Sequence, residues 1–447
     1  MLKMPAFKYW RTIVPLAVFA TIVKIFARHD FPLPDDIAVL LWWTRLDPLL
    51  LLSFLRFELA FPVWGWVPVL VILFTILFGR FFCGWLCPMG GVFALAESIK
   101  GKNKSLPQWA EFLKEYRFYW LFFLLALMML GSGWTMFLSP FHLLTAELTR
   151  IWRGEFPWLL NAIILLAFLL LPRFWCLFIC PTGLLLSFFS KWRIYSPKAP
   201  ESCSDCKICE KVCPTWAALP YPESCGQDCL MCGRCSERCP AGSFELSRNI
   251  FKQNSFDGNH FSRREFFRGT VAVAAAGTTF ATGLPAAKTN PLRPPGSLEE
   301  LEFLARCSRC GRCIKTCVSK CLHPMPLSSG WASYLTPEII PLKARCELTL
   351  DCQRVCPTGA ISHLPVEKVI IGIAKIDETR CLGWVEDKLC IICEEQCPVH
   401  AVVSDEDGLR PTILEDVCVG CGACENVCPV ENPRAVVIIP QKRRRRD

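Results

Sequence analysis

The sequence predicts an α-helical membrane domain followed by two small, cysteine-rich α+β domains, and three observations support this fold class. Residues 1–195 contain long runs of apolar side chains, whereas the rest of the chain is mostly polar. With 52% hydrophobic residues and a mean hydropathy of +0.33 over 447 residues, the chain is too apolar to be wholly soluble. Its 29 cysteines recur in triplets followed by Cys-Pro, which is a metal-ligand pattern and not a disulfide pattern.

The membrane domain is predicted to have four spans, because four apolar segments approach the roughly 20 residues that a helix needs to cross a bilayer. The segments are Thr12–Phe26, Val67–Phe82, Phe118–Leu138 and Trp158–Leu171, the last of which continues into Arg173–Leu186. Lysine and arginine concentrate before the first segment, between the second and third, and after the fourth, which places these loops in the cytoplasm. We therefore expect a multi-pass protein of a bacterial or archaeal cytoplasmic membrane.

An internal repeat lies in this domain, which comprises residues 1–195. Residues 80–90 return as residues 173–183, with Arg, Phe, Cys, Cys-Pro and Gly at matching positions. In each copy two cysteines are four residues apart, so they should project from one face of a helix. The four cysteines are Cys83, Cys87, Cys176 and Cys180. If they converge, they could ligate an intramembrane metal or iron–sulfur centre; packing residues or redox-active thiols are the alternative.

Residues 196–248 form the first predicted bacterial-ferredoxin-like domain, on the cytoplasmic side. Two motifs with the spacing Cys-x2-Cys-x2-Cys-x3-Cys-Pro follow each other here, and in such pairs the fourth cysteine binds the cluster of the other motif. We therefore assign two [4Fe-4S] clusters to the sets Cys203, Cys206, Cys209 and Cys239, and Cys229, Cys232, Cys235 and Cys213. Tetrahedral zinc sites use paired cysteines and not triplets, which disfavours zinc. Cys225 is left over and should pack as a small apolar residue.

Residues 291–447 form the second such domain, and its sixteen cysteines are the number that four cubanes need. Two motifs are complete, a third has a stretched first gap, and a fourth is one cysteine short. In that order they comprise Cys307, Cys310, Cys313 and Cys317; Cys418, Cys421, Cys424 and Cys428; Cys381, Cys390, Cys393 and Cys397; and Cys346, Cys352 and Cys356. The unassigned Cys321 could supply the missing thiolate; otherwise the fourth motif holds a three-iron cluster or none. The whole chain should therefore bind five to six [4Fe-4S] clusters.

Residues 249–290 are predicted to be a signal or anchor helix and a linker. Ser262–Arg268 fits the twin-arginine export pattern, with Arg263 and Arg264 as the paired arginines, and an apolar stretch rich in Ala, Gly and Thr follows. This pathway carries folded proteins, as the export of a domain with inserted clusters requires. The segment would act as a fifth span and place residues 291–447 in the periplasm, unless it is cleaved.

Composition argues against other cofactors and partners. The chain has six histidines and no Cys-x-x-Cys-His motif, so no haem is expected. The net charge of +9 is modest and no basic stripe with interleaved aromatic residues is present, so no nucleic-acid partner is expected. The basic run Lys442–Arg446 is either a solvated tail or a docking patch for an acidic partner.

The motifs resemble those of two families of electron-transfer proteins. Residues 1–245 resemble the NapH/MauN family, with four spans, two Cys-x3-Cys-Pro motifs and two cytoplasmic clusters, and residues 262–447 resemble the NapG/MauM family, an exported ferredoxin with four [4Fe-4S] clusters. The resemblance implies a quinol dehydrogenase module in a membrane complex, passing electrons from the membrane quinone pool to a periplasmic reductase or c-type cytochrome. One alternative is a NosR- or CcoG-like maturation or reactivation factor for a metalloenzyme. Another is a scaffold subunit that only relays electrons.

Quinol oxidation would also need a group that accepts protons. Acidic and histidine side chains in the predicted outer loops are the candidates, and the alternative for each is an ordinary loop residue. They are Asp35, Asp36, Asp47, Glu58, His142 and Glu147.

Overall fold

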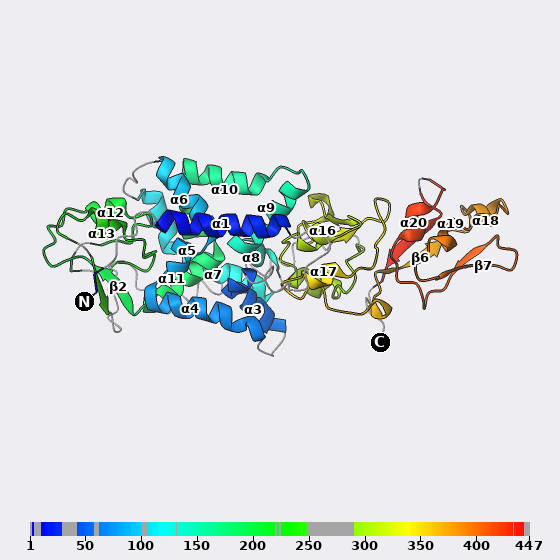
Figure 1. Cartoon of the computed structure of the whole chain (residues 1–447), viewed down its shortest axis with the longest axis horizontal. Coiled ribbons are helices and arrows are strands. Elements are labelled where there is room, and N and C mark those ends of the chain that lie inside the picture. Colours follow the sequence, from blue (N-terminus) through cyan, green and yellow to red (C-terminus); the bar gives the residue numbers. More distant parts are fainter. Residues whose placement is uncertain are drawn as a thin grey trace. The chain divides into compact units, whose positions relative to one another are not determined.

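The chain folds into two compact units (Figure 1), one drawn from residues 1–281 and the other chiefly from residues 282–447. The computed structural model describes residues 2–3, 10–28, 43–57, 62–100, 106–130, 132–219, 221–222, 225–242, 244–248, 290–431 and 433–441. The predicted signal segment with Arg263 and Arg264 lies outside these residues. The four predicted domains are a finer division than the two units, and their boundaries stay predictions.

The first unit is built from apolar helices that pack on one another (Figure 1). The longer helices are α1 (Trp10–Arg28), α3 (Pro48–Phe57), α4 (Trp66–Phe78), α6 (Pro88–Lys100), α7 (Gln108–Met129), α9 (Pro140–Trp152), α10 (Trp158–Leu169) and α11 (Pro181–Phe189). Single turns connect them: η1 (Thr44–Leu46), η2 (Val63–Gly65), α5 (Phe81–Trp85), α8 (Trp134–Phe137), η3 (Trp175–Ile179) and η4 (Ser190–Trp192). Helix α1 packs against α6, and α11 packs against α7. The fully buried Phe93 and Leu184 lie in the cores between these helices.

The prediction of a four-span membrane domain is wrong for this structure. Among the described residues, no helix combines the length and the apolar character that crossing a membrane requires. Helices α4 and α10 have 13 and 12 residues, and at 1.5 Å per residue they reach about 20 Å and 18 Å against a hydrocarbon core of about 30 Å. Helix α7 has 22 residues but carries Glu111, Lys114, Glu115 and Arg117 in its first half. The predicted multi-pass localisation is contradicted by the same finding.

The sequence repeat folds into two similar modules, each a short helical turn followed by a helix that begins at the proline of Cys-Pro. The first module is α5 and α6, and the second is η3, a π-helical turn, and α11. A Cβ atom on Gly90 would lie 2.3 Å from the carbonyl oxygen of Cys83, and one on Gly183 would lie 2.8 Å from that of Cys176. Glycine at both positions therefore lets the helix close onto the first cysteine. The prediction that the two cysteines of a copy share one helix face is wrong, because the second cysteine lies at the start of a new helix.

The cysteine-rich end of the first unit has a three-stranded antiparallel sheet with the order β1-β3-β2. The strands are β1 (Leu2–Lys3), β2 (Tyr195–Lys198) and β3 (Glu245–Arg248), and two short helices, α12 (Ile208–Val212) and α13 (Arg234–Arg238), contact each other beside them. Phe244 is fully buried here, in a core that it shares with Cys209 and Cys235. Cysteines thus take much of the place that larger apolar side chains fill elsewhere.

The second unit consists of short helices, short strands and connecting loops. The helices are α15 (Glu300–Arg306), α16 (Arg312–Thr316), η5 (Leu327–Ser329), α17 (Asp351–Arg354), η6 (Val366–Lys368), α18 (Leu382–Val385), α19 (Ile392–Glu395) and α20 (Ala423–Val427). The strands are β4 (Leu322–Pro324), β5 (Pro337–Ile339), β6 (Gly372–Ile376), β7 (Val402–Ser404), β8 (Pro411–Ile413) and β9 (Val436–Pro440). They pair as three antiparallel two-stranded sheets, β4 with β5, β6 with β9, and β7 with β8.

Candidate iron–sulfur sites

The complete cysteine motifs share one backbone conformation. In each, the residues just before and just after the second cysteine have a positive φ, so the chain curls around that position before a short helix begins. These pairs are Asp205 and Lys207, Met231 and Gly233, Arg309 and Gly311, and Gly420 and Gly422. Four of the eight residues are glycines, for which this conformation carries no steric cost. The curl aims three thiols at one point, which is what a cubane corner requires.

The two motifs of the first unit exchange their fourth cysteines. Cys213, Cys229, Cys232 and Cys235 line one hollow, which we name site B. Burial, followed by the charge of Cys213, raises the pKa of Cys232 to about 11, as expected for thiols that face one another. Site A consists of Cys203, Cys206 and Cys209 with Cys239; Cys203, Cys209 and Cys239 lie in one core, and Cys206 is exposed. Burial and the charges of Cys203 and Cys206 raise the pKa of Cys209 to about 11.

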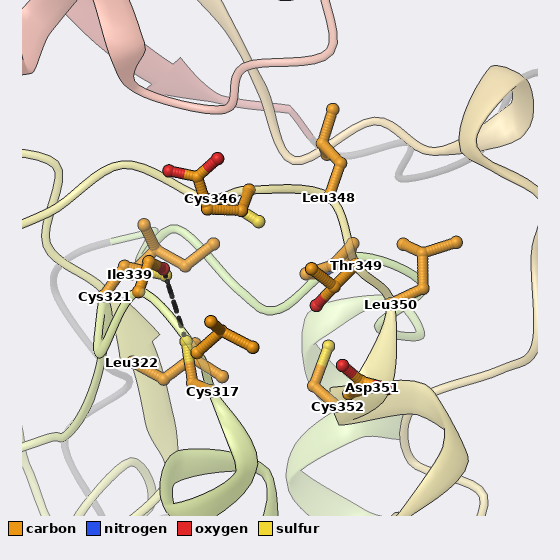
Figure 2. A pocket seen from close by; sticks show the side chains of 14 residues that line it. Cys317, Cys321, Leu322, Ile339, Cys346, Leu348, Thr349, Leu350, Asp351 and Cys352 are labelled. Atoms are coloured by element: carbon orange, nitrogen blue, oxygen red, sulfur yellow. Dashed lines mark hydrogen bonds between the residues drawn. The ribbon is translucent and has the colours of Figure 1, made fainter. Parts of the chain in front are cut away.

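The second unit has two corresponding sites around α16 and α17, which contact each other. Site C is a hollow lined by Cys307, Cys310, Cys313 and Cys356, and site D is a hollow lined by Cys317, Cys321, Cys346 and Cys352. Figure 2 shows the four cysteines of site D around their hollow, with Cys321 next to Cys317. The two sulfurs of that pair are 3.6 Å apart. Cys321 therefore brings a fourth thiol to the hollow whose motif is one cysteine short.

Thr349 occupies the position of the missing cysteine (Figure 2). The positive φ angles of Leu348 and Leu350 flank Thr349 as the corresponding residues flank the second cysteine elsewhere. The motif therefore reads Cys-x2-Thr-x2-Cys-x3-Cys-Pro from Cys346. This spacing is visible in the sequence, and it is the signal that sequence reasoning missed.

The last two sites lie around α19 and α20, which also contact each other. Site E is a hollow lined by Cys381, Cys390, Cys393 and Cys428. Site F gathers Cys418, Cys421 and Cys424 with Cys397, since burial and the charges of Cys397 and Cys418 raise the pKa of Cys421. The stretched gap after Cys381 accommodates α18 and a loop.

The four sites of the second unit adjoin one another in the order C, D, F, E. Sites C and D share α17, whose residue Cys352 belongs to D and is followed by Cys356 of C. Sites D and F meet where the amide of Cys346 donates a 2.9 Å hydrogen bond to the carbonyl of Cys421. Sites F and E meet in one core that contains Cys424 and Cys393. The spatial order therefore differs from the order of the motifs in the sequence.

The repeat cysteines form a further group of four in the first unit, which we name the helix site. Cys83, Cys87, Cys176 and Cys180 are all buried in one core. Cys87 and Cys180 precede the first turns of α6 and α11, and the amide of Gly183 donates a 3.3 Å hydrogen bond to the Cys180 sulfur. Helix N-termini stabilise negative charge, but burial has the larger effect here and raises the pKa of both thiols above its ordinary value.

Buried ion pairs position the two arginines of the repeat beside the helix site. The Arg80 guanidinium donates 2.9 Å hydrogen bonds to the Asp228 carboxylate and to the carbonyl of Cys176. It also lies 4.0 Å from the Cys83 sulfur. Arg117 also pairs with Asp228, at 2.8 Å. In the second copy, Arg173 lies 3.6 Å from Glu97. Burial raises the pKa of Cys176 to about 11, although Arg173 opposes this increase.

Site B packs directly against the helix site. The amide of Arg80 donates a 3.1 Å hydrogen bond to the carbonyl of Cys229. Leu230 lies in the same core as the four cysteines of the helix site, and a Cβ atom on Gly84 would be 2.9 Å from its carbonyl oxygen. Site B and the helix site, whose cysteines are far apart in the sequence, are therefore neighbours in the structure.

Two of the predicted proton acceptors come together next to the helix site. Asp47 is fully buried, and its carboxylate accepts hydrogen bonds from the hydroxyls of Ser139 and Thr182. His142 Nδ1 lies 3.9 Å from the same carboxylate. Burial raises the pKa of Asp47 to about 6. Glu147 is buried separately, beside Arg150; Asp35, Asp36 and Glu58 lie outside the described residues.

These thiol groups fit clusters better than single ions. In the described parts of both units, no three His, Cys, Asp or Glu side chains are placed to hold one metal ion. Sulfurs bound to one tetrahedral ion would lie within about 4 Å of one another, given bonds of about 2.3 Å. A cubane binds each thiolate through a different iron atom and therefore accepts wider spacing.

Comparisons with known proteins agree with this chemistry. A family model described as "4Fe-4S binding domain" matches residues 60–107 and 157–194, which contain the four cysteines of the helix site and no others. A model described as "4Fe-4S dicluster domain" matches residues 388–432, around sites E and F.

Several curated proteins are similar to this chain. The ferredoxin-type protein NapG of Escherichia coli K12 is 32% identical over 217 residues, which cover 44% of this chain and 90% of NapG. The methylamine utilization ferredoxin-type protein MauM of Methylorubrum extorquens is 32% identical over 203 residues, covering 40% of this chain and 90% of MauM. An uncharacterized protein of Methanocaldococcus jannaschii is 30% identical over 192 residues, covering 42% of this chain and 71% of that protein. No solved structure matches the chain.

Proposed function

The chain belongs to the family of the ferredoxin-type proteins NapG and MauM, and from this premise we propose that it is an electron relay with seven iron–sulfur sites. The observation that carries the proposal is that 28 of the 29 cysteines gather into seven sets of four, leaving only Cys225. A [4Fe-4S] cluster supplies one-electron transfer, with a potential set by hydrogen bonds to the sulfurs and by solvent exposure. The chain itself holds the thiols, buries them and spaces the sites.

The second unit supports a continuous path for electrons. Its sites adjoin in the order C, D, F, E through Cys352 and Cys356, the hydrogen bond from Cys346 to Cys421, and the core around Cys424 and Cys393. Electron transfer requires donor and acceptor to be close, and each of these contacts joins ligands of neighbouring sites. Sites C and E are then the two ends of the relay.

The helix site is the proposed seventh cluster site. Its four thiols are buried together, two of them begin helices, and Arg80 and Arg173 bring positive charge beside them. Four thiolates around a cubane carry net negative charge, which is costly to bury unless opposite charge is close. The match of a 4Fe-4S binding model to these two segments supports the same occupant. We also propose that the first 245 residues are related to NapH and MauN. This relation is separate from the membership in the NapG and MauM family stated above.

The proposed donor is a quinol, and the proposed acceptor is a reductase or c-type cytochrome. Oxidation of a quinol releases two protons with two electrons, so a proton acceptor must lie near the first electron acceptor. Asp47 and His142 supply such a pair, and Thr182, which binds Asp47, is two residues from Cys180. A carboxyl with a pKa of about 6 can accept and release protons near neutral pH.

The proposal is tested by metal analysis of the full chain, purified without oxygen. Sites A to F predict about 24 iron atoms per chain at four per cubane, and a filled helix site raises this to about 28. Dithionite should reduce these clusters, with the spectrum recorded by electron paramagnetic resonance. A zinc-dominated preparation, or fewer than about twelve irons in intact protein, would falsify the relay.

The helix site and the donor need separate experiments. Cys87→Ser with Cys180→Ser should remove about four irons, whereas the control Cys225→Ser should remove none. A reduced, water-soluble quinol analogue should reduce the clusters of the intact chain and fail to reduce those of the double variant. If the analogue fails with the intact chain while dithionite succeeds, the relay stands and the quinol donor is refuted.

A further inference from the structure

One end of the relay in the second unit reaches the protein surface at site E. Its hollow is lined almost entirely by apolar atoms, and the side chains of Cys390 and Cys393 are only half-buried. Ile392 lies between these two cysteines, lines the same hollow and is 39% exposed. An electron arriving at site E is therefore separated from solvent by little more than one side chain.

Exposed apolar side chains surround this opening. Val385 ends α18 and is 56% exposed, and Leu389 precedes Cys390 and is 72% exposed. Together with Ile392 they lie on the segment that carries three of the four site E cysteines. Exposed apolar side chains beside a functional centre are typical of a protein-binding surface.

Acidic residues border the apolar patch. Residues 381–416 contain nine acidic and two basic side chains, a net charge of −7 in a chain whose total is +9. Both basic residues are already paired, Lys388 with Glu386 and Arg410 with Asp387. Two arginines outside this segment also lie near site E, Arg380 bonded to the carbonyl of Pro433 and Arg434 bonded to that of Val430. The acidic excess therefore belongs to the segment from α18 to β8.

The turn between β7 and β8 brings acidic residues next to the apolar patch. A Cβ atom on Gly408 in this turn would be 3.9 Å from Leu389, and Arg410 reaches Asp387 across the gap at 3.0 Å. Glu406 and Asp407, at the tip of the turn, are both exposed. The α18, α19 and β7 elements of this surface are labelled in Figure 1.

We infer that the surface of Val385, Leu389 and Ile392 with its acidic border is the docking site of a basic electron-transfer protein, one whose cofactor edge is ringed by lysine or arginine. An apolar centre with a charged border is how such interfaces are built, and complementary charge accelerates encounter by about 10- to 1,000-fold at low salt. The inference rests on the proposed relay, in which site E is one of the two ends.

The test measures binding of the reduced full chain to a basic mitochondrial-type cytochrome c, by calorimetry, at several salt concentrations. Binding should weaken about tenfold or more between roughly 10 mM and 200 mM salt, because the Debye length falls from about 30 Å to below 10 Å. Glu406→Lys with Asp407→Lys should weaken binding at low salt about tenfold or more. Leu389→Ser should weaken binding at both salt concentrations.

Matched variants make the test specific to this surface. Glu367→Lys reverses an exposed charge in η6, and Leu301→Ser shortens a leucine in α15 that is 86% exposed; both should leave binding within about twofold. Glu395→Lys on α19 is a second reversal in case the turn variant loses iron. Unchanged binding in both reversals, or equal weakening by Glu367→Lys, would overturn the docking site.

The same preparations separate this inference from the relay. The second-order rate of cytochrome reduction should follow the binding changes, whereas reduction of ferricyanide, a small anionic acceptor, should not be slowed by the lysine variants. If the chain reduces ferricyanide but its reactivity with the cytochrome ignores these substitutions, the relay survives and the docking site is wrong. If dithionite leaves the clusters oxidised, the relay itself fails, whatever the binding data show.

Discussion

The helix site and the loop sites achieve the same grouping of four thiols by different means. At sites A, B, C and F, short loops with positive φ angles curl three thiols toward one point, so most of the geometry is encoded within ten residues. At the helix site, two helical modules some 90 residues apart supply two thiols each, and ion pairs such as Arg80 with Asp228 hold the modules beside site B. A loop site should therefore be little affected by substitutions elsewhere in the chain, whereas the helix site depends on buried charges that are distant in the sequence.

The largest effect is expected from Asp228→Asn, because this substitution removes a buried charge on which the helix site depends. Asp228 is 1% exposed and binds Arg80, Arg117 and the hydroxyl of Ser187. Removing its charge leaves two buried guanidinium groups uncompensated, which costs about 3–5 kcal/mol. The helix site and site B should lose iron while the four sites of the second unit keep theirs, as measured by iron analysis and by chemical unfolding. The control Glu155→Ala breaks an exposed pair with Arg153 and should cost less than about 1 kcal/mol.

Because of the same carboxylate, we expect acid to lower the folding stability of the first unit. Burial alone would raise the pKa of Asp228, but Arg117 and Arg80 outweigh it and hold the pKa well below its ordinary value of 3.8. A depressed pKa contributes stability that is present above the unfolded-state pKa and is lost as the pH falls below it. Unfolding of the wild-type first unit should therefore become easier below about pH 4, and this change should shrink in Asp228→Asn. Equal pH profiles for the two proteins would contradict the assignment.

The next effect is the loss of one cluster from a loop site. Gly420 has a φ of +71°, and a Cβ atom there would lie 2.3 Å from the carbonyl oxygen of Gly372. Gly420→Ala must therefore displace backbone at site F and should remove about four irons per chain. Gly408→Ala is the matched control, because its φ is +72° but the nearest atom is 3.9 Å away. It should cost about 1 kcal/mol and lose no iron; equal iron loss in both variants would show that φ strain and not the contact matters.

A smaller effect is expected at site D, where a single ligand is changed. Cys321→Ser should convert the site to a three-iron cluster, a loss of about one iron that the paramagnetic resonance of the oxidised protein detects. Adding Thr349→Cys to that variant should restore the four-iron cluster, because residue 349 occupies the place of the second cysteine. An unchanged spectrum in Cys321→Ser would show that Cys321 is no ligand.

The smallest effect belongs to Cys225→Ala. Cys225 is buried and lines the hollow of site B, but the four other cysteines there complete the ligand set. The substitution should leave the iron content unchanged and cost about 1 kcal/mol for the small cavity. A loss of four irons would make Cys225 a ligand and would refute the grouping of Cys213 with site B.

What could be predicted from the sequence follows the same division between local and distant interactions. The spacing of the cysteines predicts the loop sites, and the family membership and iron–sulfur domains are confirmed by the comparisons. The four spans are wrong because apolar runs predict helices but not where they break; Leu170, for example, ends α10 early. The buried partners of the repeat arginines, Asp228 and Glu97, were missed because nothing local marks an acidic residue as the mate of an arginine 148 or 76 positions away.

The hollow of site D shows how one cysteine of such a set could be replaced by another through successive substitutions without the number of thiols falling below four. Cys321 reaches the hollow from the turn after Cys317, while Thr349 holds the place that the other motifs give to cysteine. A chain with cysteine at both 321 and 349 would have a spare thiol and could lose either one. Replacing one thiol by the other would therefore need only two single substitutions, the gain preceding the loss, and at least four thiols would line the hollow at every step.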